Sequence, residues 1–372
     1  MAIRQNQGVA RRASKHGLHA GVLLMAALTV VGCNLRGGVQ EASADPGPRR
    51  LAALPDGRKL NLACAGRGSP TVLLEAGFGA DSQAWFKVQP ALAKLTRVCA
   101  YDRAGYGYSD PGPSPRDGAA VARDLDQALA AADIAGPFIV VGHSAGGLYA
   151  RLFAARRAQD VAGLVLLDPT IERNAPQPSG DGLDGLRQRV QRCLAASQAT
   201  PPASDTDSRW SGCRPANPSP HQLEVSKRPA TWSNQLSELD TLFGRTSEQA
   251  TMTVSLLKSM PLYVITASQT ANAAPTYGFN PPQSVWELLH QRLASRSDFG
   301  SQRTVFSSHM IMLDRPEIVI AATEQMIAAQ RAGHPPEALP PAEREFSPGE
   351  APSTSLPPTS DAGFQGILDR HR

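Results

Sequence analysis

The chain has 372 residues, enough to bury a large core in one α/β domain with an insertion or in two smaller domains. Its formal net charge of +4 comes from the first 33 residues, which hold four basic and no acidic side chains, so that 33 Lys and Arg balance 33 Asp and Glu in the remainder. A near-neutral body gives no argument for nucleic acid binding, and without a Walker A loop, a zinc-spaced Cys/His cluster or a calcium loop in the sequence we expect no metal or cofactor.

The first 33 residues resemble a bacterial signal peptide of the lipoprotein type. A basic start precedes the apolar run 21–31, which is too short to span a bilayer comfortably. The run ends in Val-Val-Gly-Cys, similar to a lipobox, so Cys33 is expected to carry a lipid that anchors the protein to a membrane of the cell envelope, on the periplasmic face or at the outer membrane. An ordinary cleaved signal is the alternative. The polar, Pro/Gly-rich residues 34–50 predict a flexible linker.

Strands and helices alternate from residue 51 to residue 170. The predicted elements are a hairpin (51–54 and 59–64, turning at Asp56-Gly57), a buried strand (71–75), a helix (82–95), a strand (97–101) and a helix (118–132). Alternation at this spacing predicts a mostly parallel sheet with helices on both faces.

The most informative motif is G-x-S-x-G at residues 142–146, between the apolar run 137–141 and a helical pattern at 147–156. In this motif the serine occupies a strained turn between strand and helix, where a Cβ on either flanking glycine would clash with neighbouring backbone. Ser144 is therefore the candidate nucleophile, and the backbone N–H of Ala145 faces the place where an oxyanion would form.

The order of these pieces resembles the α/β-hydrolase superfamily: a strand, the glycine loop 76–80, a strand ending in D-R-x-G-x-G-x-S, a helix, and G-H-S-x-G. The likeness covers residues 51–170 and, more loosely, 259–332. It implies the α/β-hydrolase fold and a second oxyanion donor, the backbone N–H of Phe78. The usual His-Gly before this donor is Ala76-Gly77 here. Asp102, on the far side of the nucleophile strand, is expected to anchor its own loop.

The alternation breaks after a strand at 161–167. Residues 171–258 contain Pro/Ser/Gly-rich stretches and two helical patterns (183–196 and 222–243), and the resemblance implies a helical cap that shapes the pocket and excludes water. The core is expected to resume over 259–332, with strands at 261–266 and 302–306 and helices at 283–294 and 316–329. Residues 333–372, rich in Pro, Ser, Glu and Ala, predict a disordered tail.

A serine nucleophile needs a base in hydrogen-bond reach, and the base needs an orienting acid. His309 follows the expected last strand, where the superfamily places its histidine. The usual acid position follows strand 261–266, but residues 267–270 carry no carboxylate. Asp168, at the end of the preceding strand, is a position that some members use, and it is our expected acid. Asp298, or no acid at all, is the alternative.

Four cysteines are left if Cys33 carries a lipid. The superfamily's usual strand order makes the second hairpin strand a neighbour of the strand at 97–101, which implies a disulfide between Cys64 and Cys99. Cys193 and Cys213 would then pin the cap. Buried free thiols are the alternative.

These features predict a serine hydrolase, similar to a carboxylesterase or lipase, that acts on a small acyl substrate through an acyl-enzyme. Two other readings stay open. The same three residues could serve perhydrolysis, C–C bond hydrolysis or peptide cleavage. Alternatively, the missing carboxylate after Thr266 favours a non-catalytic binding protein on a hydrolase scaffold.

Overall fold

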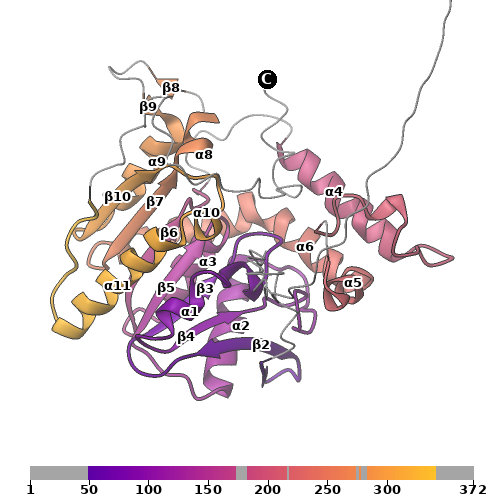
Figure 1. Ribbon diagram of the computed structural model, residues 1–372, viewed down its shortest axis with the longest axis horizontal. Helices are drawn as coiled ribbons and strands as arrows, with labels where there is room; N and C mark the ends of the chain where they lie inside the picture. The colour runs from indigo at the N-terminus through magenta and orange to yellow at the C-terminus, as the bar shows by residue number, and fades with distance from the viewer. Residues whose placement is uncertain (1–48, 173–181, 216–217, 274–275, 278–282, 341–372) are drawn as a thin grey trace, which may run out of the picture. The chain divides into compact units, whose positions relative to one another are not determined.

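The computed structural model describes residues 49–172, 182–215, 218–273, 276–277 and 283–340 (Figure 1). The predicted signal segment with Cys33, most of the predicted linker and residues 341–372 of the predicted tail lie outside the described residues. No helix within the described ranges is long and apolar enough to cross a membrane.

A sheet of eight strands forms the centre of the described chain (Figure 1). The strands, in their order across the sheet, are β1 (Arg50–Ala53), β2 (Lys59–Ala65), β4 (Val98–Tyr101), β3 (Thr71–Glu75), β5 (Phe138–His143), β6 (Val161–Leu167), β7 (Leu262–Ala267) and β10 (Gly300–Val305). The hairpin strands β1 and β2 pair antiparallel, and all pairs from β4 to β10 are parallel. The predicted mostly parallel sheet is confirmed.

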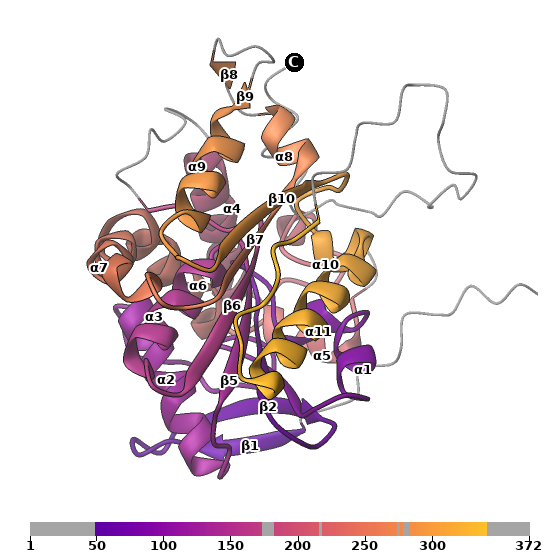
Figure 2. The same cartoon turned by 90° about the vertical axis from the view of Figure 1, so that its left-hand side faces the viewer.

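Helices cover both faces of this sheet, as the turned view shows (Figure 2). One face packs against α2 (Gly118–Ala131), α3 (Gly146–Arg156) and α9 (Val285–Ala294). The other face packs against α1 (Gln89–Leu92), α10 (Ile311–Asp314) and α11 (Pro316–Ala332). Because β3, β5 and β7 are buried along their whole length, they read in the sequence as continuous apolar runs rather than alternating ones.

Two predicted helices are each divided in the structure. The pattern at 82–95 forms a 3-10 turn, η1 (Ser82–Trp85), followed by α1. Pro90 explains the break, because in one continuous helix it would remove an internal hydrogen bond and clash with the preceding turn. The pattern at 222–243 likewise forms α5 (Pro220–Ser226) and α6 (Pro229–Thr241), with Pro229 starting the second helix.

The expected insertion lies between β6 and β7, and all of its regular elements in the described residues are helical. Its elements are α4 (Gly182–Ser197), η2 (Ser208–Trp210), α5, α6, the π-helical turn η3 (Leu242–Thr246), α7 (Ser247–Met252) and η4 (Val254–Leu257). After β7 come α8 (Ser268–Ala273) and a two-stranded ribbon, β8 (Thr276–Tyr277) with β9 (Gln283–Ser284).

Both implied disulfides are present in the structure. One joins Cys64 to Cys99, which face each other in register on β2 and β4. The other joins Cys193 on α4 to Cys213 just after η2, so it closes a loop inside the cap.

The beginning of the predicted disordered tail packs on the core instead. The Tyr263 hydroxyl and the Gln325 side-chain amide both donate to the carbonyl of Glu337, and the Leu339 N–H donates to the Ser301 hydroxyl. The prediction was wrong for residues 334–340, because composition gave no sign of these long-range bonds to β7, β10 and α11.

Candidate active site

The corner between β5 and α3 has the geometry that the G-x-S-x-G motif requires. Ser144 has φ of 53°, in the left-handed region that is strained for a residue with a side chain. A Cβ on Gly142 would stand 2.7 Å from the Gly146 carbonyl oxygen, and one on Gly146 would stand 2.5 Å from the Glu75 carbonyl oxygen. Glycine at both positions is therefore a steric requirement of this corner, and Ser144 is 7% exposed.

Asp168 and His309 meet at the same edge of the sheet. The Nδ1 atom of His309 lies 2.6 Å from Oδ2 of Asp168, which directly follows β6 and is fully buried. The contact forms because β6 and β10 run parallel, so the residues after their carboxyl ends meet at one edge. The unusual acid position at the end of β6 is thus within direct hydrogen-bond reach of the imidazole.

The alternative acid, Asp298, lies elsewhere. It precedes β10, whereas His309 follows it, and six strand residues separate the two ends by about 20 Å. Its backbone N–H donates to the Lys258 carbonyl 2.8 Å away. Asp298 therefore belongs to the opposite edge of the sheet and cannot contact the imidazole of His309.

The second carboxylate oxygen of Asp168 accepts hydrogen bonds from two donors, neither of which the sequence analysis identified. The Ala267 N–H donates to Oδ1 at 3.1 Å, and the indole N–H of Trp286, on the first turn of α9, donates to the same atom at 2.8 Å. Trp286 stands 118 positions from Asp168 in the sequence, and no local pattern marks it. These bonds fix the carboxylate plane that faces His309.

The charge of Asp168 is stabilised by its neighbours. Burial alone would raise the pKa of this carboxyl, but the hydrogen bond and charge of His309, with smaller contributions that include the nearby His290, lower the pKa to about 2. Asp168 is therefore ionised at neutral pH and can stabilise a protonated imidazole. Burial lowers the pKa of His290, whose Nε2 faces the Pro169 carbonyl at 2.9 Å.

The His309 loop is fastened to the Ser144 corner by the residue before the serine. The ring of His143 lies 4.7 Å from that of His309, centroid to centroid, and its Nε2 lies 2.9 Å from the His309 carbonyl oxygen. A carbonyl only accepts, so Nε2 of His143 carries the proton. On the other side, Asp314 accepts from the Ser308 N–H at 3.0 Å. Ser144 and His309 thus lie at one edge of the sheet.

The two expected oxyanion donors flank the serine. A Cβ on Gly77 would come within 3.2 Å of the Ser144 Cβ, so the loop that carries Phe78 runs directly against the serine. Ala145 stands on the other side, at the start of α3, where backbone N–H groups lack helical partners. Both residues are buried.

Asp102 anchors its own loop, as expected. One carboxylate oxygen accepts from the Tyr108 N–H and the other from the Ser82 N–H, each at 2.9 Å. A Cβ on Gly107 would stand 2.3 Å from this carboxylate, so glycine is needed for the close approach.

Apolar side chains of the cap pack against the residues that flank the serine. A buried cluster joins Phe78, Ala145 and Leu148 of the core to Leu186 of α4 and Trp232 of α6. Such a wall can bury the methylene groups of a small acyl chain. Across residues 49–340, as far as they are described, no group of three or more His, Cys, Asp or Glu is arranged to hold a metal ion.

A family model described as the alpha/beta hydrolase fold matches residues 70–249. An uncharacterized protein of Schizosaccharomyces pombe is 46% identical over 81 residues, which are 22% of this chain and 15% of that protein. The uncharacterized protein YqjL of Bacillus subtilis is 33% identical over 106 residues, 28% of this chain and 42% of that protein. The chain thus matches less than half the length of these relatives.

Solved structures align over most of the chain. The epoxide hydrolase CorEH has a TM-score of 0.54 at 18% identity and covers 76% of this chain and 99% of its own. An enol-lactonase from Burkholderia xenovorans has a TM-score of 0.52 at 18% identity, and the match covers 75% of this chain and 100% of that protein. A thermophilic esterase from Thermogutta terrifontis has a TM-score of 0.53 at 20% identity, and the match covers 77% of this chain and 99% of that protein. At such identities the likeness concerns the fold.

Proposed function

We propose that this chain, which has the α/β-hydrolase fold, is a member of the α/β-hydrolase superfamily and a serine hydrolase that cleaves carboxylic esters through an acyl-enzyme. The match of residues 70–249 to the alpha/beta hydrolase family model supports the general reaction class. The observation that carries the finer proposal is the 2.6 Å contact between His309 and a fully buried, ionised Asp168, beside a serine held in the left-handed conformation.

Each residue has one role in the proposed reaction. The Ser144 hydroxyl attacks the ester carbonyl while Nε2 of His309 takes its proton, and Asp168 stabilises the resulting imidazolium without accepting the proton. The backbone N–H groups of Phe78 and Ala145 stabilise the oxyanion. Collapse breaks the ester C–O bond, and His309 returns the proton to the leaving alcohol. Water then repeats the cycle on the acyl-enzyme and releases the acid.

The apolar wall beside the serine favours acyl chains of short or medium length. A panel of 4-nitrophenyl esters of rising chain length, assayed with wild type and with Ser144→Ala, tests the proposal. We expect turnover with short or medium esters that disappears in Ser144→Ala. Ser295→Ala is the matched control, because Ser295 is an exposed residue just after α9 and its hydroxyl donates to the Arg292 carbonyl at 3.0 Å.

A fluorophosphonate probe separates this proposal from its competitors. Labelling of Ser144 without ester turnover would direct the search to other reactions of the same three residues, such as C–C bond hydrolysis, perhydrolysis or peptide cleavage. If folded wild type is not labelled at all, the catalytic proposal is wrong and a binding role on a hydrolase scaffold is favoured.

We further propose that Cys33 carries a lipid and that the hydrolase works at the cell envelope, tethered through residues 34–50. The lipobox-like sequence before Cys33 supports this. Metabolic labelling with a fatty-acid analogue, followed by membrane fractionation, should show a labelled, membrane-bound protein. Cys33→Ser should be unlabelled and released, and an unlabelled wild type would contradict the anchor.

A further inference from the structure

We infer that Arg103 is a positioning residue that orients the oxyanion donor of Phe78 and is itself held by Glu238 of the cap, so that docking of α6 and assembly of the oxyanion site are linked. This inference rests on the proposed ester hydrolysis. It begins from a buried cluster of two carboxylates and one guanidinium, to which the catalytic steps assign no role.

The guanidinium of Arg103 donates hydrogen bonds to two backbone carbonyls of the glycine loop 76–80. Arg103 is the second residue after β4, and its side chain is 2% exposed. Its Nη1 donates to the Ala76 carbonyl at 2.7 Å, and its Nη2 donates to the Gly77 carbonyl at 2.8 Å. Donors that carry charge form stronger hydrogen bonds than neutral ones, so the two carbonyl directions are firmly set.

Holding the Gly77 carbonyl also sets the direction of the Phe78 N–H. The two groups belong to one planar peptide unit, in which C=O and N–H point in opposite directions. The Gly77 carbonyl points to Arg103, so the Phe78 N–H points the other way. The same contact polarises the peptide, which strengthens its N–H as a donor to a developing negative charge.

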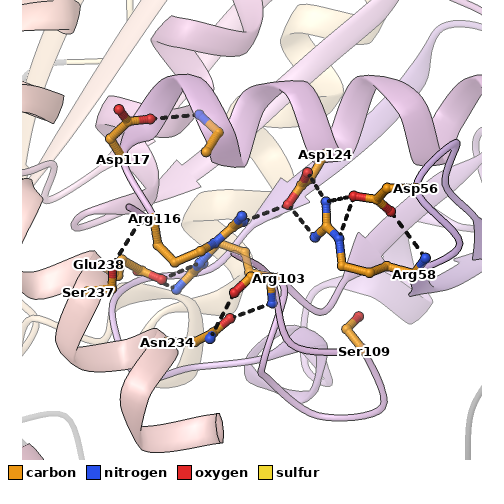
Figure 3. A network of polar contacts seen from close by, with 12 residues as sticks. Asp56, Arg58, Arg103, Ser109, Arg116, Asp117, Asp124, Asn234, Ser237 and Glu238 are labelled. Atoms are coloured by element: carbon orange, nitrogen blue, oxygen red, sulfur yellow. Dashed lines mark hydrogen bonds and ion pairs between the residues drawn. The ribbon is translucent and has the colours of Figure 1, made fainter. Parts of the chain in front are cut away.

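The other side of the guanidinium belongs to the cap. Glu238, on α6, accepts from Nη2 at 3.1 Å and from Nε at 3.3 Å, and Glu75 accepts from Nη1 at 2.9 Å (Figure 3 shows the Arg103–Glu238 pair). Together with the two carbonyls, these partners use all five N–H groups of Arg103. The rings of Tyr106 and Tyr149 lie 4.7 Å and 5.3 Å from the guanidinium carbon.

The helix that carries Glu238 is fastened to the core by two residues that precede Glu238, Asn234 and Ser237 (Figure 3). Asn234 accepts from the Gly112 N–H at 2.7 Å and donates to the Gly112 carbonyl at 3.2 Å. Ser237 accepts from the Arg116 N–H at 3.0 Å. These hydrogen bonds fix the position of α6 on the core, and with it the position of Glu238 relative to Arg103.

Of the two carboxylates that contact Arg103, Glu238 is the better one to substitute in an experiment. Burial raises the pKa of Glu75 to about 7, although the charge of Arg103 opposes this, so Glu75 is partly protonated at neutral pH. Removing Arg103 outright would leave two buried acidic groups without their cation, which is strongly destabilising. Arg103→Lys keeps the charge but offers three donors instead of five, without the planar fork.

The experiment measures kcat and KM for an ester and for the matching thionoester in wild type, Arg103→Lys, Glu238→Gln and a control, Glu224→Gln. Glu224 is also a cap residue, but its side chain is 65% exposed and pairs with Lys227. Thermal unfolding of each variant checks that it is folded. If Arg103→Lys does not fold, Glu238→Gln decides alone.

For Arg103→Lys we expect kcat on the ester to fall by about 100-fold, the scale of losing one oxyanion donor, with KM nearly unchanged. For Glu238→Gln we expect a fall of about 10-fold, because the Arg103 fork is kept but less firmly held. Sulfur accepts hydrogen bonds weakly, so the preference of the enzyme for the ester over the thionoester should shrink in both variants. Glu224→Gln should match wild type.

Two results overturn the inference while leaving the proposed function intact: full kcat in folded variants, or lower activity with an unchanged preference for the ester, which indicates a merely structural role. Failure of the proposed function looks different. Wild type itself would then neither turn over esters nor react with the fluorophosphonate probe.

Discussion

The carboxyl edge of the sheet and the cap are built by different forces. At the sheet edge, the parallel strands β5, β6 and β10 end close together, and Ser144, Asp168 and His309 follow these strand ends. In the cap, side chains of η3 and α7 accept hydrogen bonds from core backbone: the Thr246 hydroxyl accepts from the Gly118 N–H, and the Gln249 side-chain carbonyl accepts from the Ala119 N–H.

The cap itself is uneven. The segment α6–α7 has these backbone contacts, whereas α4 meets the core through the apolar cluster that contains Leu186, and the end of α5 is held within the cap by exposed ion pairs such as Lys227 with Asp205. Exposed ion pairs contribute little stability. Because the residues of the proposed chemistry lie at the sheet edge and outside the cap, changes in α4 and α5 should alter substrate fit before they alter the chemical step.

The largest effect is expected from Asp168→Asn at the sheet edge. The amide cannot stabilise a protonated His309 and favours the wrong tautomer, so kcat should fall by a factor on the order of 10⁴. Asp298→Asn makes the same chemical change at the opposite edge and should leave kcat unchanged. Stopped-flow ester hydrolysis measures both, and a near-normal rate in Asp168→Asn would remove Asp168 from the mechanism.

A smaller effect is expected from Trp286→Phe, which removes one donor to the Asp168 carboxylate. A hydrogen bond to a charged group contributes about 1.5–3 kcal/mol, so kcat should fall by about 10- to 100-fold. Trp210→Phe is the matched cap variant, because its indole N–H donates only to the Ser204 carbonyl at 3.0 Å. Equal losses in the two variants would contradict the contrast between sheet edge and cap.

The disulfides sharpen the contrast further. The double variant Cys193→Ser/Cys213→Ser should raise KM several-fold with kcat within about 2-fold, because it loosens α4 above the acyl site. Closing a loop of this size stabilises by about 3 kcal/mol in chain-entropy terms. Cys64→Ser/Cys99→Ser, between β2 and β4, should lower the melting temperature without changing KM. A larger KM change in the second pair would reverse the interpretation.

The smallest expected effect is a change in acid sensitivity at His143. Burial, aided by the charge of His309, lowers the pKa of His143 from 6.5 to about 3. Between these values the unfolded chain binds a proton that the folded chain does not, so stability is lost as the pH falls below about 6.5.

His143→Gln keeps a donor for the His309 carbonyl but does not titrate. Its free energy of unfolding should therefore fall less than that of wild type between pH 7 and pH 5, by up to about 1.4 kcal/mol per pH unit. Urea unfolding at both pH values measures this, with His221→Gln of the cap as control. The same loss in His143→Gln and wild type would show that His143 does not contribute to acid sensitivity.

Much of the fold could be predicted because its causes are local. The buried runs that form β3, β5 and β7 are continuous in the sequence, and the crowding at Gly142 comes from the neighbouring turn itself, whereas the crowding at Gly146 comes from Glu75 at the end of β3. The breaks in the two divided helices are also marked locally, by Pro90 and Pro229. The prediction of two unbroken helices was wrong because the apolar periodicity continues past these prolines, whereas the helices do not.

The sequence by itself determined the alternation of strands and helices and the serine corner. Because no carboxylate directly follows Thr266, it also indicated Asp168 as the acid. Only the tertiary structure decided that Trp286 holds that acid and that Arg103 joins the glycine loop to Glu238. Those partners stand 118 and 135 positions apart, and they meet because strand order and cap docking bring them together. Local sterics can be read along the chain, whereas such meetings depend on the packing of the whole domain.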